Sequence, residues 1–121
     1  MIKIYGDIML DRWVYGSCDR VSPEAPILVL KEDEYTYSIG GAGNLATNLS
    51  SINKNVELYS CVANDKEGNK LQELLRKTKI NCFIEDDAEM TTTKTRFVGQ
   101  NGQQVMRWDR ERIYTQDTII D

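Results

Sequence analysis

Three glycines fall within four positions in the stretch YSIGGAGNLATN, residues 37–48, although the chain has only eight glycines among its 121 residues. Apolar residues then recur at helical spacing, which predicts a helix over about residues 42–51. A glycine has no Cβ, so such a run is useful where the chain turns sharply or where a ligand approaches the backbone. Backbone N–H groups at the helix start could meet hydroxyl or anionic oxygens. Asn44 adds an amide that both donates and accepts hydrogen bonds.

The pattern Gly41-x-Gly43-x-x-Ala46 also fits the dinucleotide-binding fingerprint GxGxxA. That fingerprint requires the first strand of a βαβ unit directly before the glycines and an acid at the end of the next strand. Here another predicted strand and Gly6-Asp7 come first, and Glu57 stands at the beginning of the following strand. No GKS or GKT follows, so a P-loop is absent as well. Structural packing and a polyhydroxylated ligand at the helix start remain as alternatives.

Two carboxylates stand in GDIMLD, where Asp7 and Asp11 follow the first predicted strand. In open α/β sheets, ligands bind beyond the carboxyl ends of the strands. Carboxylates there suit sugar hydroxyls as well as a metal ion. For either aspartate taken alone, a role in a turn or a helix cap is the commoner one.

Cations gather in TTTKTRFVGQNGQQVMRWDRE, residues 91–111, around the hairpin signal Asn101-Gly102. With those two residues as the loop, Gln100 faces Gln103 and Val98 faces Val105. Continuing outward, Arg96 faces Arg107 and Lys94 faces Asp109, all on one side of the ribbon.

Like charges directly opposite one another are unfavourable, so an anion between Arg96 and Arg107 would explain them, and guanidinium groups match phosphate well. The alternative is a set of solvated edge charges partly offset by Asp109. A bulge in the ribbon would also change the register.

The elements that must position these groups alternate between strand and helix. Short strands are predicted at residues 2–5, 27–30, 56–62 and 81–84, with helices after the glycines and after Asp65, which can cap the second helix. This succession favours a parallel α/β sheet in a single domain.

The composition excludes several classes of function. There is no histidine, which removes imidazole-based triads and HExxH metal sites. Three widely spaced cysteines form no CxxC pair, so we expect buried small apolar residues rather than zinc ligands or disulfides. A net charge of −4 argues against nucleic acid, and no apolar run has membrane-spanning length. The N-terminus is too short and polar for a signal peptide, so we expect a cytoplasmic protein.

Taken together, several motifs resemble the N-terminal part of ribokinase-like (PfkB) carbohydrate kinases. They are GDIMLDRWVYG, RVSPEAPILVLK, GGAGNLATNLSSI, NDKEGNKL and the hairpin stretch, and they cover nearly the whole chain. The resemblance is strongest to the kinase domains that phosphorylate D-glycero-β-D-manno-heptose 7-phosphate in bifunctional enzymes of ADP-heptose synthesis. It implies an α/β fold with a partial parallel sheet, flanking helices and a β-strand lid, formed by residues of about 13–38 and 91–109.

The resemblance also implies roles for individual residues. Asp11 would bind sugar hydroxyls, with Asp7 as a further candidate, and Gly40, Gly41 and Asn44 would form the turn that faces the sugar. Lid strands over the sugar phosphate would carry four more site residues, Lys94, Arg96, Gln103 and Arg107. Two departures stand out: Gly43 replaces a usual alanine, and Ser60 and Ala63 stand where a GxxGxD pattern has glycines.

The second half of the family, with the GxGD segment whose aspartate is the general base, has no counterpart in this sequence. The family's ATP and Mg²⁺ would be handled there, so the resemblance implies a sugar-phosphate-binding half that binds neither alone and is inactive alone. Its partners would be a sugar phosphate, a second copy through the lid strands and a complementing C-terminal half. The alternative functions are a non-catalytic sugar-phosphate binder and a dimeric assembly module.

Overall fold

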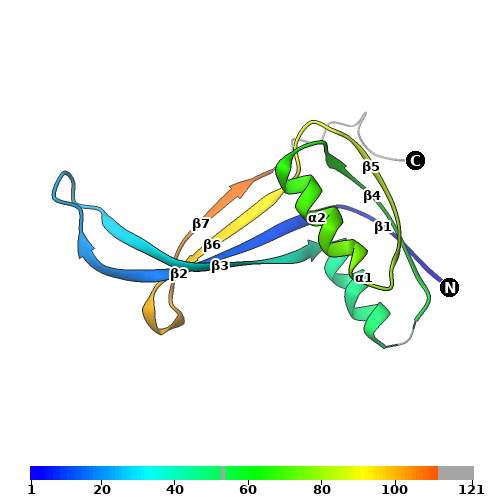
Figure 1. The fold of residues 1–121 in the computed structure, drawn as a ribbon, viewed down its shortest axis with the longest axis horizontal. Helices are drawn as coiled ribbons and strands as arrows, with labels where there is room; N and C mark the ends of the chain where they lie inside the picture. Colours follow the sequence, from blue (N-terminus) through cyan, green and yellow to red (C-terminus); the bar gives the residue numbers. More distant parts are fainter. Residues whose placement is uncertain (53, 112–121) are drawn as a thin grey trace.

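Two β-sheets and two α-helices make up residues 1–52 and 54–111, the part of the chain that the computed structural model describes (Figure 1). The core sheet has the order β1-β4-β5, and all its pairings are parallel. The lid sheet has the order β3-β2-β6-β7. Core strands are β1 (Ile2–Tyr5), β4 (Val56–Ala63) and β5 (Asn81–Ala88), and lid strands are β2 (Ile8–Val21), β3 (Leu28–Gly41), β6 (Thr93–Val98) and β7 (Gln104–Arg110).

The hydrophobic core lies between the core sheet and the helices α1 (Ala42–Ser51) and α2 (Lys66–Arg76). Successive side chains of a strand point to opposite faces, and Leu58 and Val62 of β4 are buried on the face toward the helices. Leu71 and Leu75 of α2 are buried against it at helical spacing. The predicted parallel sheet with flanking helices is therefore confirmed, and α1 has the predicted bounds.

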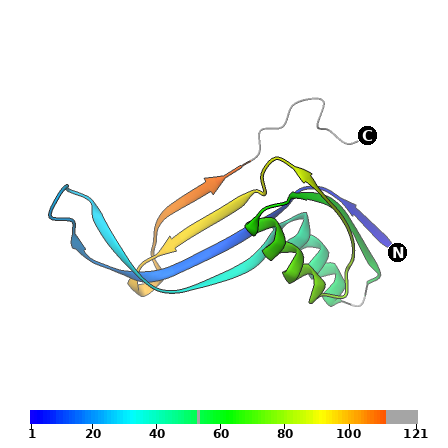
Figure 2. The same ribbon diagram turned by 45° about the horizontal axis from the view of Figure 1, so that its top comes forward.

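The lid sheet is continuous with the hydrophobic core, because β2 begins inside it. β2 begins with Ile8 and Leu10, which belong to the core cluster, and then extends away from the helices (Figure 2). β3 pairs with β2 antiparallel over most of its length. The short strand predicted at residues 27–30 is thus wrong as a separate element, because Leu28 starts the long strand β3, which runs to Gly41.

A hydrogen-bonded joint ties the start of α2 to the entry of β6. The Asp65 carboxylate accepts from the Gly68 N–H at 2.7 Å, from the Thr91 hydroxyl at 2.7 Å and from the Thr91 N–H at 3.2 Å. The Thr91 hydroxyl oxygen accepts from the Ala63 N–H at the end of β4. Asp65 is the N-cap of α2, as predicted, and the joint also fixes where the lid strand β6 begins.

The β6–β7 hairpin follows the predicted register only in part. From Phe97 outward the pairs are as predicted, and Arg96 lies directly opposite Arg107. Nearer the turn, Val98 pairs with Gln104 instead of Val105, and the predicted facing of Gln100 and Gln103 is wrong. The turn holds three residues, Gln100–Gly102, and an irregularity between Phe97 and Val98 restores the register.

No helix in the described ranges is long and apolar enough to cross a membrane.

Candidate sugar-phosphate site

Charged side chains from three strands meet on one face of the lid sheet. In the register, Asp11 of β2 is beside Lys94 of β6, and Lys94 is opposite Asp109 of β7. The next positions outward bring Trp13 beside Arg96, with Arg107 opposite it. The parallel pairing of β2 with β6 therefore adds Asp11 to the cations that the hairpin pattern predicts.

Arg96 lies against two side chains of β2. Its Nη1 atom lies 3.4 Å from Asp11 Oδ1, and its guanidinium carbon lies 4.9 Å from the centre of the Trp13 ring. The Asp11 and Arg96 side chains are 19% and 20% exposed. Those two atoms are buried and form no hydrogen bond within the described residues, although they are an ion pair. A buried polar atom without a hydrogen bond destabilises the protein. A ligand hydroxyl that donates to Asp11, or a phosphate oxygen that accepts from Arg96, would therefore bind favourably there.

Carboxylates balance the other two cations. Lys94 Nζ lies 3.1 Å from Glu111 Oε1 and 4.0 Å from Asp109 Oδ2. Arg107 donates to Asp109 at 2.9 Å. The face was predicted as three cations with Asp109 as a partial offset. The structure brings Asp11 and Glu111 to them as well, so an anion must compete with these carboxylates.

The glycines at the end of β3 allow the chain to pass close beside Asp7 and Asp11. A Cβ on Gly40 would lie 2.8 Å from Asp11 Oδ2, so the missing side chain leaves room for that carboxylate. Gly41 has φ +64°, and its Cβ would lie 2.5 Å from the Asp7 carbonyl oxygen. The Ala42 N–H donates to this same oxygen at 2.8 Å. The backbone of Asp7 thus holds the turn, and no side chain caps the start of α1.

The structure does not bring every predicted site residue to this cluster. Asp11, Gly40, Lys94, Arg96 and Arg107 share one region of the lid sheet. The other predicted residues lie at its borders: Asp7 and Gly41 at the turn before α1, Asn44 exposed in the first turn of α1, and Gln103 exposed beside the hairpin turn.

Sequence reasoning did not single out Trp13 or Glu111. Trp13 stands two positions after Asp11, so it points to the same face of a strand, but that signal is usable only once residues 8–21 are known to form one strand. Glu111 follows the last residue of β7, and no periodicity marks it.

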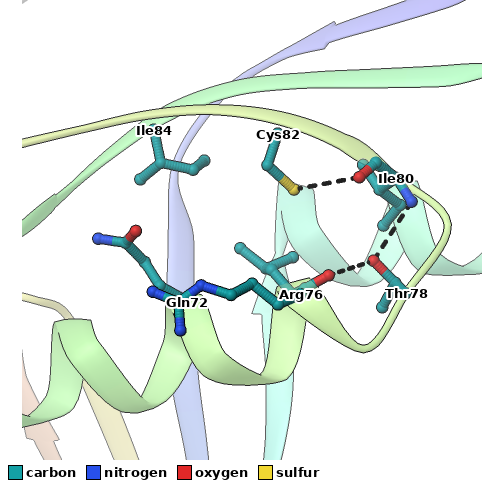
Figure 3. A pocket seen from close by; sticks show the side chains of 7 residues that line it. Gln72, Arg76, Thr78, Ile80, Cys82 and Ile84 are labelled. Carbon is teal, nitrogen blue, oxygen red and sulfur yellow. Dashed lines mark hydrogen bonds between the residues drawn. The ribbon is translucent and has the colours of Figure 1, made fainter.

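Two hollows lie outside this face. One, of about 320 Å³, lies between α2 and β5, where Cys82 and Ile84 face Gln72 and Arg76 (Figure 3). Its lining mixes apolar side chains with the polar groups of Gln72, Arg76 and Thr78, and burial raises the pKa of the Cys82 thiol. The other, of about 460 Å³, lies between α2 and the opposite face of the lid sheet, next to Trp108.

The cysteines do not form a metal site in the described part of the chain. Cys18, Cys61 and Cys82 are of intermediate burial, whereas buried residues were expected. Among the described residues, no three cysteine or carboxylate side chains converge as ligands of a metal ion would.

The fold is that of the ribokinase-like sugar kinases, and comparison with known proteins agrees. The chain resembles the acarbose kinase Mak1 with a TM-score of 0.75 at 16% identity, covering 99% of this chain and 39% of that one. A carbohydrate kinase from Agrobacterium tumefaciens gives a TM-score of 0.73 at 20% identity, covering 90% and 34% of the two chains. At such identities the likeness concerns the fold alone.

The family model of the pfkB family carbohydrate kinases matches residues 1–118, so the chain belongs to this family. Bifunctional protein HldE of Coxiella burnetii is 46% identical over 112 residues, which are 92% of this chain and 23% of that protein. HldE of Haemophilus influenzae is 40% identical over 114 residues, 93% of this chain and 24% of that protein. The chain thus spans about a quarter of the length of these curated relatives.

Proposed function

We propose that this chain is the substrate-binding part of a sugar-phosphate kinase whose substrate is heptose 7-phosphate or a close analogue. The observation that carries the proposal is the meeting of Asp11, Lys94 and Arg96 on one face of the lid sheet, beside Gly40. The similarity to HldE proteins favours a heptose over other sugars.

The chemistry of these groups fits a phosphorylated sugar. The Asp11 carboxylate can accept hydrogen bonds from sugar hydroxyls, since an ionised carboxylate has only acceptors. Arg96 and Arg107, directly opposite each other, can donate to the oxygens of one phosphate. The N–H groups at the uncapped start of α1 and the Asn44 amide can bind further hydroxyl groups.

ATP and Mg²⁺ belong to the proposed reaction of the complete kinase. Phosphoryl transfer depends on positioning and on electrostatic stabilisation of the transferred group. Among the described residues, no three cysteine or carboxylate side chains converge, and the sequence contains no GxGD segment. We therefore propose that this chain is inactive alone, and that a polypeptide with the general base and the nucleotide site completes it.

Isothermal titration calorimetry with heptose 7-phosphate tests the site. We expect binding by the wild-type chain and, for Arg96→Met, an affinity at least about tenfold lower, because a charged hydrogen bond to phosphate contributes roughly 1.5–3 kcal/mol. Lys77→Met, which removes an exposed cation at the C-cap of α2, is the matched control and should bind as the wild type does. No detectable heat at millimolar ligand would rule out both this function and a non-catalytic sugar-phosphate binder.

A dimeric assembly role is the second candidate, and exposed apolar residues on the lid favour it. Ile27 and Leu28 at the end of the β2–β3 hairpin and Met106 and Trp108 on β7 are all exposed. Both β3 and β7 are edge strands of the lid sheet, and uncovered edges favour pairing between chains. We propose that the lid strands join two copies.

A further inference from the structure

The charged face of the lid sheet is built as two rows of side chains that run across the neighbouring strands β2, β6 and β7 (Figure 2). The row nearer the core, which we call the inner row, holds one residue of each strand: Asp11, Lys94 and Asp109. The outer row holds the next residues on the same face: Trp13, Arg96 and Arg107. The two rows lie two residues apart, about 7 Å along the strands.

The inner row places a carboxylate on each side of one lysine. Neighbouring strands are about 4.8 Å apart, so the backbones of Asp11 and Asp109 are separated by about 10 Å. Their side chains are 19% and 26% exposed. An ionised carboxylate only accepts hydrogen bonds, and hydroxyl groups at opposite positions of a sugar ring can donate to two acceptors at this separation.

Asp109 has one carboxylate oxygen that its neighbours do not use. Its Oδ2 atom accepts from Arg107 at 2.9 Å and lies 4.0 Å from Lys94 Nζ. Its Oδ1 atom is buried and has no hydrogen-bond partner within the described residues, and the same is true of Asp11 Oδ1. Buried polar atoms normally have such a partner. Each end of the inner row therefore carries an acceptor for which the described residues supply no donor.

Neutralisation of the cations does not account for Asp109. Lys94 Nζ lies closer to Glu111, at 3.1 Å, than to Asp109, at 4.0 Å. The contact with Arg107 uses Oδ2 alone. The Arg107 side chain is 50% exposed, so it can turn toward a phosphate in the outer row. Both oxygens of Asp109 then become acceptors for a ligand.

We propose that Asp109 is a second hydroxyl-binding carboxylate of the sugar-phosphate site, on the other side of Lys94 from Asp11. This inference rests on the proposed function and deepens it, because it divides the ligand between the two rows. The inner row supplies the acceptors for sugar hydroxyls. The arginines of the outer row, together with the long side chain of Lys94, supply the donors to the phosphate. In a heptose phosphorylated on its terminal carbon, the phosphate stands away from the ring hydroxyls, which agrees with the separation of the rows.

Calorimetry with two ligands, heptose 7-phosphate and inorganic phosphate, tests the role of Asp109. We expect Asp109→Ala to bind heptose 7-phosphate at least about tenfold more weakly, because hydrogen bonds to a charged group are among the stronger ones. It should bind inorganic phosphate about two- to fivefold more tightly, because a carboxylate that competes for Arg107 is removed. The opposite signs separate hydroxyl recognition from neutralisation of charge.

Two further variants complete the test. Asp109→Asn keeps one acceptor oxygen, so its affinity for heptose 7-phosphate should lie between those of the wild type and Asp109→Ala. Asp87→Ala, which removes an exposed acid of β5, is the matched control and should bind both ligands as the wild type does. Circular dichroism establishes that each variant is folded, and Asp109→Asn carries the test alone if the alanine variant is not.

Two results would overturn this inference and leave the proposed function in place. The first is an affinity of Asp109→Ala for heptose 7-phosphate that equals or exceeds that of the wild type, which would make Asp109 a neutralising charge only. The second is an equal loss of affinity for both ligands, which would show that Asp109 acts only by orienting Arg107. Failure of the wild type to bind heptose 7-phosphate would overturn the proposed function as well.

Discussion

At the scale of single residues, the cations of the lid face could bind an anion, but neighbouring carboxylates already neutralise them. Arg96 lies between the Trp13 ring and the Asp11 carboxylate, so its orientation is set before any ligand arrives. Lys94 is instead held by Glu111, whose side chain is 55% exposed. An exposed ion pair contributes only about 0–1 kcal/mol, so little binding free energy is lost when a phosphate displaces Glu111 from Lys94.

Neutralising Glu111, which competes with an anion for Lys94, should strengthen anion binding. We expect Glu111→Gln to raise the affinity for heptose 7-phosphate by about two- to fivefold, which corresponds to the strength of an exposed ion pair. Calorimetry at low salt measures the change. Glu89→Gln removes an exposed carboxylate elsewhere on the chain and should leave the affinity as it is. Weaker binding by Glu111→Gln would show that Glu111 contributes to the site.

Gly40 should matter for binding rather than for folding. A Cβ there would meet the Met9 and Asp11 side chains at 2.7 and 2.8 Å, and both can move aside. We expect Gly40→Ala to fold with a change of less than about 1 kcal/mol in the free energy of unfolding, but to lose sugar-phosphate affinity because Asp11 is displaced.

Gly68→Ala provides the contrast. Its Cβ would lie 2.2 Å from the Ala63 backbone oxygen, which cannot move aside. We expect it to cost about 1–3 kcal/mol of stability, as measured by urea denaturation. Equal stability of the two variants would contradict this assignment.

At the scale of elements, the joint at Asp65 sets the entry of the lid strand β6. Burial alone would raise the pKa of Asp65, but hydrogen bonds from Thr91 and Gly68 and the charge of Arg110 outweigh it and lower the pKa. A carboxyl group with a lowered pKa in the folded state stabilises the fold above its ordinary pKa of 3.8. That stabilisation is lost as the pH falls through the lower folded-state pKa.

Asp65→Ala should therefore destabilise the protein in a pH-dependent way. At pH 7 we expect a loss of about 1–2 kcal/mol, the range measured for helix N-caps. The difference between the wild type and the variant should shrink as the pH falls below 3.8, the ordinary value for this group. Thermal denaturation at a series of pH values measures it, with Asp87→Ala, an exposed acid of β5, as the control. A difference that is constant with pH would contradict the role of the charge.

The elements differ in how far the sequence predicts them. Local signals are sufficient for α1, for the Asp65 cap and for the opposition of Arg96 and Arg107, because each depends on residues close in sequence. The parallel pairing of β2 with β6 joins segments some 80 residues apart, and no local pattern encodes it. The site residues Trp13 and Glu111 depend on that pairing or on the end of β7, which explains why spacing alone did not reveal them.

At the scale of the whole molecule, apolar groups remain exposed at two separate places, the lid and the face of the core sheet that carries Tyr5 and Phe83. The lid sheet is antiparallel at its edges, whereas the core sheet is parallel. An antiparallel sheet can leave one face to solvent, whereas a parallel sheet rarely does.

The proposed dimer should depend on the end of the β2–β3 hairpin. We expect Leu28→Glu to convert a homodimer into a monomer, because the charge would have to be buried in the interface without a partner. Light scattering coupled to size exclusion gives the mass directly. Ile52→Glu, which changes an exposed residue at the end of α1, should leave the mass unchanged. A wild type that is monomeric at high concentration would exclude the lid-mediated dimer.

The three-residue turn of the β6–β7 hairpin is a suitable place for a spectroscopic label. Asn101 and Gly102 both have positive φ. A side chain added at Gly102 would meet no atom within 4 Å but would be strained by its φ of +74°, whereas the exposed Asn101 already carries a side chain at φ 69°. The irregularity between Phe97 and Val98 separates this turn from the Arg96–Arg107 pair. A fluorescent label in place of Asn101 could therefore report binding at the lid without touching Arg96 or Arg107.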